Sequence, residues 1–206
     1  TAMLTLYQDP RSGNCYKAVL TAAHLGLRLK TVDIDVMSGM TRKPDFLVKN
    51  PNGRVPTLEF EDGRHLPESN AIIWYLAEGS PLIPADKFQR AQMLQWMFFE
   101  QYSHEPYIAV ARFWMVFATK EQLRQKEHLI PEWHAKGDAA LAVMEGQLKK
   151  HDWFVGNAYS LADIALYAYT HCAQDGGFDL SMYPAITAWL DRVRKTKGFV
   201  PMGASR

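Results

Sequence analysis

The 206-residue sequence predicts an α/β domain followed by an all-helical domain. Over residues 1–78, short apolar segments typical of strands alternate with helical patterns, whereas from residue 87 onward apolar residues recur only at helical spacing. Between these regions, residues 79–86 hold two prolines and a glycine, which interrupt both patterns. We therefore expect one domain at 1–78, a linker at 79–86 and a second domain at 87–206.

The first domain is expected to begin with a strand at Leu4–Tyr7 and a helix from about Cys15 to Leu25, which Gly26 ends. The elements expected after it are a strand at Lys30–Asp35, a helix or turn at Thr41–Lys49, a turn at Asn50–Gly53, strands at Thr57–Phe60 and His65–Leu66, and a helix at Ser69–Ala77. This order predicts one parallel pair of strands followed by a hairpin, in a small sheet covered by helices.

Helical spacing in the second domain predicts two long segments, Lys87–Phe117 and Gln122–Lys149. A further helix is expected from Ser160 to about Gln174, and a last one over Tyr183–Lys197.

Composition narrows the functional classes. The 23 basic and 22 acidic residues nearly balance, so neither nucleic acid nor an anionic membrane is an expected partner. The two cysteines, Cys15 and Cys172, make no disulfide framework, and no apolar run reaches about 18 residues. We therefore expect a cytoplasmic protein. No metal site is expected, because the histidines show no metal-ligand spacing with cysteine.

The turn after the first strand is suited to holding an anion. Ser12, Gly13, Asn14 and Cys15 lie where a helix begins, and the first N–H groups of a helix have no partner within it. Ser12 can add a directed O–H donor, and Gly13 lets a ligand approach the backbone. Ser and Asn are also ordinary capping residues, so the turn alone does not define a site.

Two further motifs suggest a ligand with peptide character. Pro56 stands at the entry to a strand, and a cis bond to Val55 would turn the Val55 main chain outward, where an extended peptide could pair with it. Glu68 and Ser69 open the next helix, whose N-terminus can receive a carboxylate while Glu68 attracts an ammonium group.

These motifs together resemble the glutathione transferase superfamily over essentially the whole chain. Ser160 and Asp163, with capping-box spacing, resemble the folding motif of its helical domain. The run from Ser12 to Lys17 is most similar to the serine-type bacterial members related to the theta, tau and zeta classes. The resemblance implies a thioredoxin-like first domain, glutathione as co-substrate and a homodimer.

The resemblance also implies roles for individual residues. Ser12 falls at the position of the catalytic Ser or Cys, with Lys17 as the basic residue that follows, and its role would be to donate a hydrogen bond to the glutathione thiolate. Asn14, alone or with Ser12, and Cys15 are the other candidates for activating the thiol. The remaining glutathione contacts implied are Lys43, Val55, Pro56, Glu68 and Ser69.

The second substrate would be a hydrophobic electrophile bound against the first long helices of the second domain. Tyr107, Phe113 and Trp114 are the implied pocket residues, although aromatic residues at helical spacing also build cores. Transfer of glutathione to this electrophile is the leading function. Glutathione-dependent disulfide or peroxide reduction and non-enzymatic binding of glutathione or a protein remain open.

Overall fold

The computed structural model describes residues 3–204, which divide into two compact units. The first unit holds the described residues up to Ile83 together with the segment from Thr196 onward, and the second holds Pro84–Lys195. The C-terminal segment joins the first unit through hydrogen bonds to α1 (Gly13–Leu25): the Tyr16 hydroxyl donates to the carbonyl of Val200 at 2.5 Å. The predicted helical domain, 87–206, includes this C-terminal segment, whereas the second unit ends before it, at Lys195.

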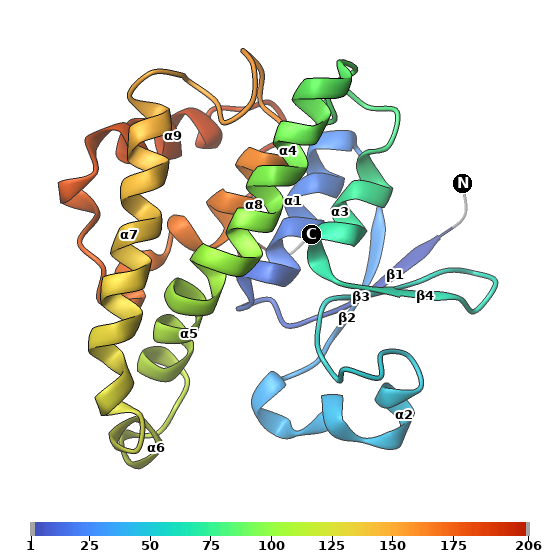
Figure 1. Cartoon of the computed structure of the whole chain (residues 1–206). Coiled ribbons are helices and arrows are strands. Elements are labelled where there is room, and N and C mark those ends of the chain that lie inside the picture. Colours follow the sequence, from blue (N-terminus) through green and yellow to red (C-terminus); the bar gives the residue numbers. More distant parts are fainter. Residues whose placement is uncertain (1–2, 205–206) are drawn as a thin grey trace. The chain divides into compact units, whose positions relative to one another are not determined.

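The sheet of the first unit has four strands, β1 (Leu4–Gln8), β2 (Leu29–Asp33), β3 (Thr57–Glu59) and β4 (His65–Pro67). They lie in the order β2-β1-β3-β4, as Figure 1 shows. β1 and β2 are parallel, whereas the β1–β3 and β3–β4 pairs are antiparallel. The predicted parallel pair followed by a hairpin is therefore confirmed.

The two faces of this sheet differ because successive side chains of a strand point to opposite sides. Leu6 and Leu58 lie opposite each other in the register of β1 and β3, and both are fully buried. The adjacent residue, Tyr7, points to the other face, where its ring meets Phe46 of α2 (Pro44–Leu47) edge-on at 6.1 Å. On the helical side, α1 packs beside α3 (Ser69–Ala77) (Figure 1).

Several predicted boundaries shift. α1 begins at Gly13 rather than Cys15, because Ser12 caps it. The predicted strand at Lys30–Asp35 ends at Asp33, since Asp35 caps a short 3-10 helix at Val36–Ser38. The predicted helix or turn at 41–49 is a 3-10 turn, Met40–Arg42, followed by α2.

The second unit is helical, as predicted. Its α-helices are α4 (Lys87–Phe99), α5 (Glu105–Val116), α6 (Lys120–Arg124), α7 (Ile130–Leu148), α8 (Leu161–Thr170) and α9 (Pro184–Arg194). A π-helical turn, Glu100–His104, interrupts the predicted segment 87–117. The segment 122–149 is divided before Ile130, and the helix expected to reach Gln174 ends at Thr170, ahead of a 3-10 turn at Ala173–Gly176.

Asp163 organises the start of α8, whose residues are all buried. Its carboxylate accepts hydrogen bonds from the main-chain N–H of Ser160 at 3.0 Å and of Phe154 at 3.3 Å, and from the Trp189 indole of α9 at 2.9 Å. With Ser160 it completes a capping box. The motif therefore has the structural role that the sequence predicts, joining α8 to α9.

Candidate active site

Ser12 lies at the end of a tight turn between β1 and α1. The turn is closed by the Ser12 N–H, which donates to the Asp9 carbonyl at 2.9 Å. Ser12 is also the N-cap of α1, and its Oγ accepts a hydrogen bond from the Cys15 N–H at 3.3 Å. The half-buried hydroxyl thus lies at the positive end of a 13-residue helix with its O–H able to donate to an anion.

A chain of side-chain hydrogen bonds joins the start of α1 to the start of α3. Ser69 Oγ donates to Asn14 Oδ1 at 3.2 Å, and Lys17 Nζ donates to Ser69 Oγ at 3.3 Å. Lys17 is fully buried and Ser69 is 5% exposed. The structure therefore brings Asn14, Lys17 and Ser69 together beside two helix N-termini, where negative charge is favoured.

Glu68, the residue before α3, has an unusual backbone conformation. Its φ of +74° makes it the one non-glycine residue with positive φ in the described part of the chain. With a ψ of +112° the residue lies outside the left-handed helical region, and sparsely populated backbone conformations cost on the order of 1–3 kcal/mol. Its side chain is exposed, so this conformation presents a carboxylate at the mouth of the α3 N-terminus.

The Val55–Pro56 peptide bond is cis. Side-chain hydrogen bonds hold the loop before it, since Asn50 Nδ2 and Thr57 Oγ1 both donate to the Arg54 carbonyl, at 2.9 and 3.1 Å. In residues 3–204 the main-chain N–H and C=O of Val55 have no hydrogen-bond partner. They are the groups that an extended peptide would pair with.

Lys43 lies at the N-terminus of α2, and its side chain is exposed. It forms no ion pair with another described residue. The neighbouring Arg42 instead donates to the Asn52 carbonyl at 3.0 Å, which fixes this segment to the loop that precedes β3. Among residues 3–204, Lys43 thus has no ion-pair partner and no side-chain contact to Ser12.

Asp9 and Arg11 are site features that the sequence reasoning missed. Asp9 is buried, and its carboxylate accepts from the main chain and guanidinium of Arg11 and from the Val36 N–H. Burial raises the pKa of Asp9, but these hydrogen bonds lower it more, so the net shift is downward. The available signal was the Asp-Pro pair, since Asp at the first position and Pro at the second are typical of a β-turn.

The side chain of Tyr7 lies on the opposite face of the sheet from α1, where its hydroxyl is hydrogen-bonded. Its hydroxyl donates to Glu59 Oε2 at 2.6 Å, and the same oxygen is 2.9 Å from Lys49 Nζ and 3.1 Å from His65 Nε2. Hydrogen bonds from Tyr7, Lys49 and His65 lower the pKa of Glu59 to about 2. Burial, followed by the bond to Glu59, raises the pKa of Tyr7, which makes a tyrosinate unfavourable.

The Cys15 side chain faces the interior. It is fully buried, and burial raises the pKa of its thiol to about 12. A reactive cysteine needs an accessible thiolate, and Cys15 has neither exposure nor a lowered pKa. The other cysteine, Cys172, is also buried, with its pKa raised to about 11.

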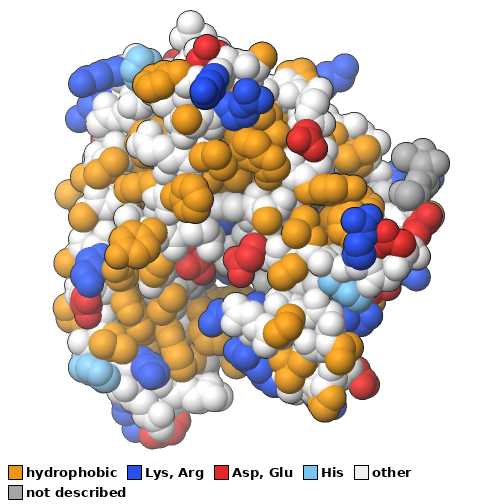
Figure 2. Space-filling model, turned by 45° about the vertical axis from the view of Figure 1, so that its right-hand side comes forward, with side chains coloured by type: hydrophobic (Ala, Val, Ile, Leu, Met, Phe, Trp, Pro, Cys, Tyr) orange, Lys and Arg blue, Asp and Glu red, His pale blue; other side chains and the backbone are white. Residues whose placement is uncertain are grey.

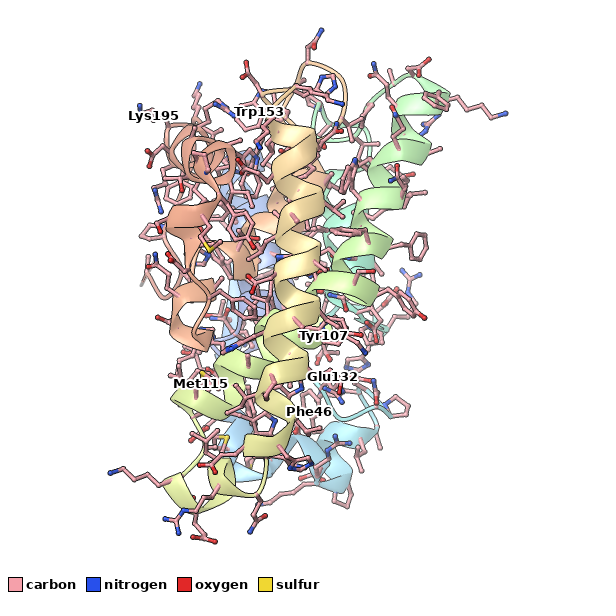
Figure 3. The ribbon with its side chains drawn as sticks, turned by 60° about the vertical axis from the view of Figure 1, so that its left-hand side comes forward. Phe46, Tyr107, Met115, Glu132, Trp153 and Lys195 are labelled. Carbon is pink, nitrogen blue, oxygen red and sulfur yellow. The ribbon has the colours of Figure 1, made fainter. Side chains whose placement is uncertain are left out.

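The three predicted pocket residues lie half-buried on α5. Figure 3 labels Tyr107 near Glu132 of α7, and Lys136 connects them: its ammonium is 5.2 Å from the Tyr107 ring and 2.6 Å from the Glu132 carboxylate. Phe113 meets Trp114 edge-on at 5.5 Å, and Lys126 lies 5.3 Å from the Trp114 ring. These rings therefore form a partly accessible aromatic surface on the second unit.

Two polar residues near these rings in the sequence, His104 and Arg112, have structural contacts. His104 is fully buried and shares a 2.8 Å hydrogen bond with Thr170 of α8. Arg112 is 7% exposed and pairs with Asp175 at 3.3 Å. His104 therefore helps to hold the π-helical turn against α8, and Arg112 helps to hold α5 against the 3-10 turn at Ala173–Gly176.

Among residues 3–204, no group of three or more His, Cys, Asp or Glu side chains is arranged to hold a metal ion. In the same range, no helix combines the length and apolar character that crossing a bilayer requires.

Family models identify the class of protein that this fold and site represent. Residues 11–78 match the glutathione S-transferase N-terminal domain, and residues 96–196 match the C-terminal domain. The chain is 33% identical to glutathione S-transferase F10 of Arabidopsis thaliana, over 82% of this chain and 80% of that protein. It is 28% identical to the disulfide-bond oxidoreductase YfcG of Escherichia coli, over 93% and 90%. The chain belongs to the glutathione S-transferase superfamily.

Solved structures agree with this membership. The fold matches a glutathione S-transferase from Pseudomonas fluorescens with a TM-score of 0.93 at 52% identity, covering 97% of this chain and 98% of that one. It matches a possible glutathione S-transferase from Rhodopseudomonas palustris with a TM-score of 0.95 at 48% identity, covering 98% and 91%. The predicted thioredoxin-like domain followed by a helical domain is therefore confirmed.

Proposed function

We propose that this protein is a glutathione transferase in which Ser12 stabilises the thiolate of glutathione. The observation that carries the proposal is the position of the Ser12 hydroxyl at the N-cap of α1, half-buried and next to Gly13. A free thiol has a pKa of about 8.5, and each unit of lowering corresponds to about 1.4 kcal/mol of thiolate stabilisation. A hydroxyl donor together with a helix N-terminus is suited to supply one or two such units, as estimates of helix–anion and hydrogen-bond energies suggest.

The rest of glutathione would be held by groups of the same unit. Ser69 and the α3 N-terminus would receive the α-carboxylate of the γ-glutamyl group, and Glu68 would attract its ammonium. The unpaired main chain of Val55, next to Pro56, would pair with the cysteinyl residue as a short added strand. Lys43, exposed and without an ion pair among the described residues, is assigned to the glycyl carboxylate.

The electrophile would lie against the aromatic surface of Tyr107, Phe113 and Trp114. Half-buried rings offer a hydrophobic electrophile both apolar contact and accessible area. In the reaction the thiolate sulfur forms a bond to the electrophilic carbon, and the leaving group departs with the electron pair of the bond that breaks.

Asn14 and Cys15 rank behind Ser12 as activators. The Asn14 carbonyl oxygen accepts from Ser69, so this residue is better suited to orient the α3 N-terminus or to assist Ser12. Cys15 is disfavoured by complete burial and by a thiol pKa of about 12.

Disulfide reduction is the second candidate function. The similarity to the disulfide-bond oxidoreductase of Escherichia coli favours it. With both cysteines buried and no Cys-x-x-Cys motif, such a reaction would use glutathione itself as the thiol. One glutathione thiolate would attack a sulfur of the substrate disulfide, forming a mixed disulfide and releasing one substrate thiolate. A second glutathione thiolate would attack the glutathione sulfur of this mixed disulfide, giving oxidised glutathione and releasing the second substrate thiolate.

We further propose a cytoplasmic homodimer. Along α4 and the π-helical turn after it, large side chains are left exposed: Phe88 is 70% exposed, Phe98 is 72% and Tyr102 is 84%. Their spacing places them along one side of the helix. Figure 2 shows hydrophobic side chains at many places on the visible surface, and exposed groups of large apolar side chains are typical of protein interfaces. A second copy of the chain is the proposed occupant, and sedimentation as a 23.5 kDa monomer would exclude it.

Two glutathione-dependent assays distinguish the functions. With 1-chloro-2,4-dinitrobenzene, a transferase forms a sulfur–carbon bond and releases chloride; with 2-hydroxyethyl disulfide, a reductase forms oxidised glutathione. We expect conjugation to be the faster reaction. Reduction without conjugation would favour the second function, and glutathione binding without either reaction would favour a non-enzymatic member. Failure to bind glutathione would contradict the proposal.

A further inference from the structure

We infer that Asp9 is a positioning residue for the thiol-activating turn, in which its buried carboxylate holds Ser12 in the orientation that stabilises a thiolate. This inference rests on the proposed function of Ser12. Asp9 lies between β1 and α1, and its hydrogen-bond partners all belong to the first unit.

The main chain of Asp9 makes one hydrogen bond to Ser12 and one to Cys15. The Asp9 carbonyl accepts the Ser12 N–H at 2.9 Å, which closes the turn. The Asp9 N–H donates to Cys15 Sγ at 3.4 Å, which anchors the turn to the first turn of α1. The Asp9 main chain is therefore bound both to Ser12 and to Cys15, the residue whose N–H donates to Ser12 Oγ.

The side chain of Asp9 fixes two further residues, Arg11 and Val36, which its main chain does not contact. Oδ1 accepts from the Arg11 N–H at 3.0 Å and from Arg11 Nε at 2.9 Å, while Oδ2 accepts from Arg11 Nη2 at 2.7 Å and from the Val36 N–H at 3.1 Å. Arg11 immediately precedes Ser12. The carboxylate therefore joins Arg11, which precedes Ser12, to Val36, which follows β2. These bonds fix the position of the turn relative to the sheet.

Burial makes this arrangement specific for a carboxylate. The Asp9 side chain is 2% exposed, and every contact to its oxygens is an N–H donor. An amide of the same shape has one acceptor oxygen and one NH₂ group, so it can keep at most two of these four bonds: either the two to Oδ1 from Arg11, or the two to Oδ2 from Arg11 Nη2 and Val36. Asp9→Asn would therefore release one side of the turn while leaving the volume of the side chain unchanged.

The charge of Asp9 and its positioning role predict opposite effects on glutathione. A buried negative charge near the site disfavours a second negative charge, so its removal alone would lower the pKa of a nearby thiol. If Asp9 instead acts by holding Ser12, the Asp9→Asn variant loses the oriented donor, and the thiol pKa rises. The direction of the shift thus separates the two effects.

The experiment is an ultraviolet titration of the thiolate absorbance of glutathione bound to the wild-type protein, Asp9→Asn and Asp35→Asn. Asp35 is the matched control because it binds the same guanidinium at 2.7 Å but is exposed, and Asn can still accept from the Met37 N–H. We expect Asp9→Asn to raise the thiol pKa by about one unit, a tenfold change in the thiolate-to-thiol ratio. Asp35→Asn should keep the wild-type value.

If circular dichroism shows that Asp9→Asn does not fold, Arg11→Ala is the second variant. It removes the guanidinium bonds from a side chain that is 44% exposed and keeps the Asp9 main-chain bonds, so a smaller rise is expected. A lowered pKa in Asp9→Asn, or wild-type values in the folded variants, would overturn the inference while leaving the proposed function intact. A normal thiol pKa in the wild-type complex would overturn both.

Discussion

The thiol of Cys15 accepts a hydrogen bond from the main-chain N–H of Asp9, with a nitrogen–sulfur distance of 3.4 Å. This contact gives the cysteine a structural role at the back of the turn that presents Ser12. Cys15 and Ser12 thus have different roles: the buried thiol of Cys15 holds the turn, and the half-buried hydroxyl of Ser12 is available to a ligand.

Replacement of this cysteine should spare catalysis. In Cys15→Ala, kcat for conjugation should fall by less than about tenfold, because the fully buried thiol, with a pKa of about 12, supplies no thiolate, and the bonds of the Asp9 carboxylate and carbonyl still hold the turn. The lost sulfur should lower the free energy of unfolding by about 1 kcal/mol. Steady-state kinetics and urea unfolding measure the two effects. A loss of kcat of a hundredfold or more in the folded variant, on the order seen when a nucleophile is removed, would instead assign the chemistry to Cys15.

The Glu59 cluster should make stability depend on acid pH. The folded-state pKa of Glu59 is about 2, against an ordinary value of 4.5, so the unfolded chain binds more protons between these values. The contribution is fully present above about pH 4.5 and is lost as the pH falls through 2. The free energy of unfolding, measured in urea, should therefore fall over this window more steeply for the wild type than for Glu59→Gln. Parallel curves would show that Glu59 has no such role.

Asp163 should be among the residues that matter most for stability. Asp163→Ala removes one half of the capping box, worth about 1 kcal/mol, and leaves buried N–H donors without an acceptor, at about 1–3 kcal/mol. We expect a loss of about 3 kcal/mol in urea unfolding, as the sum of these effects. Asp191→Ala is the control: that carboxylate is 59% exposed and pairs with Arg194. It should change stability by less than about 0.5 kcal/mol, and equal losses in both variants would contradict the assignment.

Much of the fold could be predicted because its signals are local. Strand and helix order in the first domain follows from alternation and from turn residues, and the capping box at Ser160 and Asp163 needs only four consecutive positions. The π-helical turn at Glu100–His104 could not be predicted, since helical spacing continues through it.

In the candidate site, too, the local features could be predicted from the sequence and the long-range contacts could not. Ser12 and Ser69 stand at helix starts, which the sequence marks through their neighbours. The bond between Lys17 and Ser69 joins residues 52 positions apart, and the contact from Val36 to Asp9 spans 27. Such pairings depend on how the elements pack, so the role of Asp9 became visible only in the structure.

The central claim is that Ser12 stabilises the glutathione thiolate. Its most direct test is the ultraviolet titration of glutathione bound to the wild-type protein and to Ser12→Ala, with Ser38→Ala as a control at an exposed serine. We predict a lowered thiol pKa in the wild type and the control, and a return toward the free value of about 8.5 in Ser12→Ala. The same lowered pKa in Ser12→Ala, with glutathione still bound, would contradict the account.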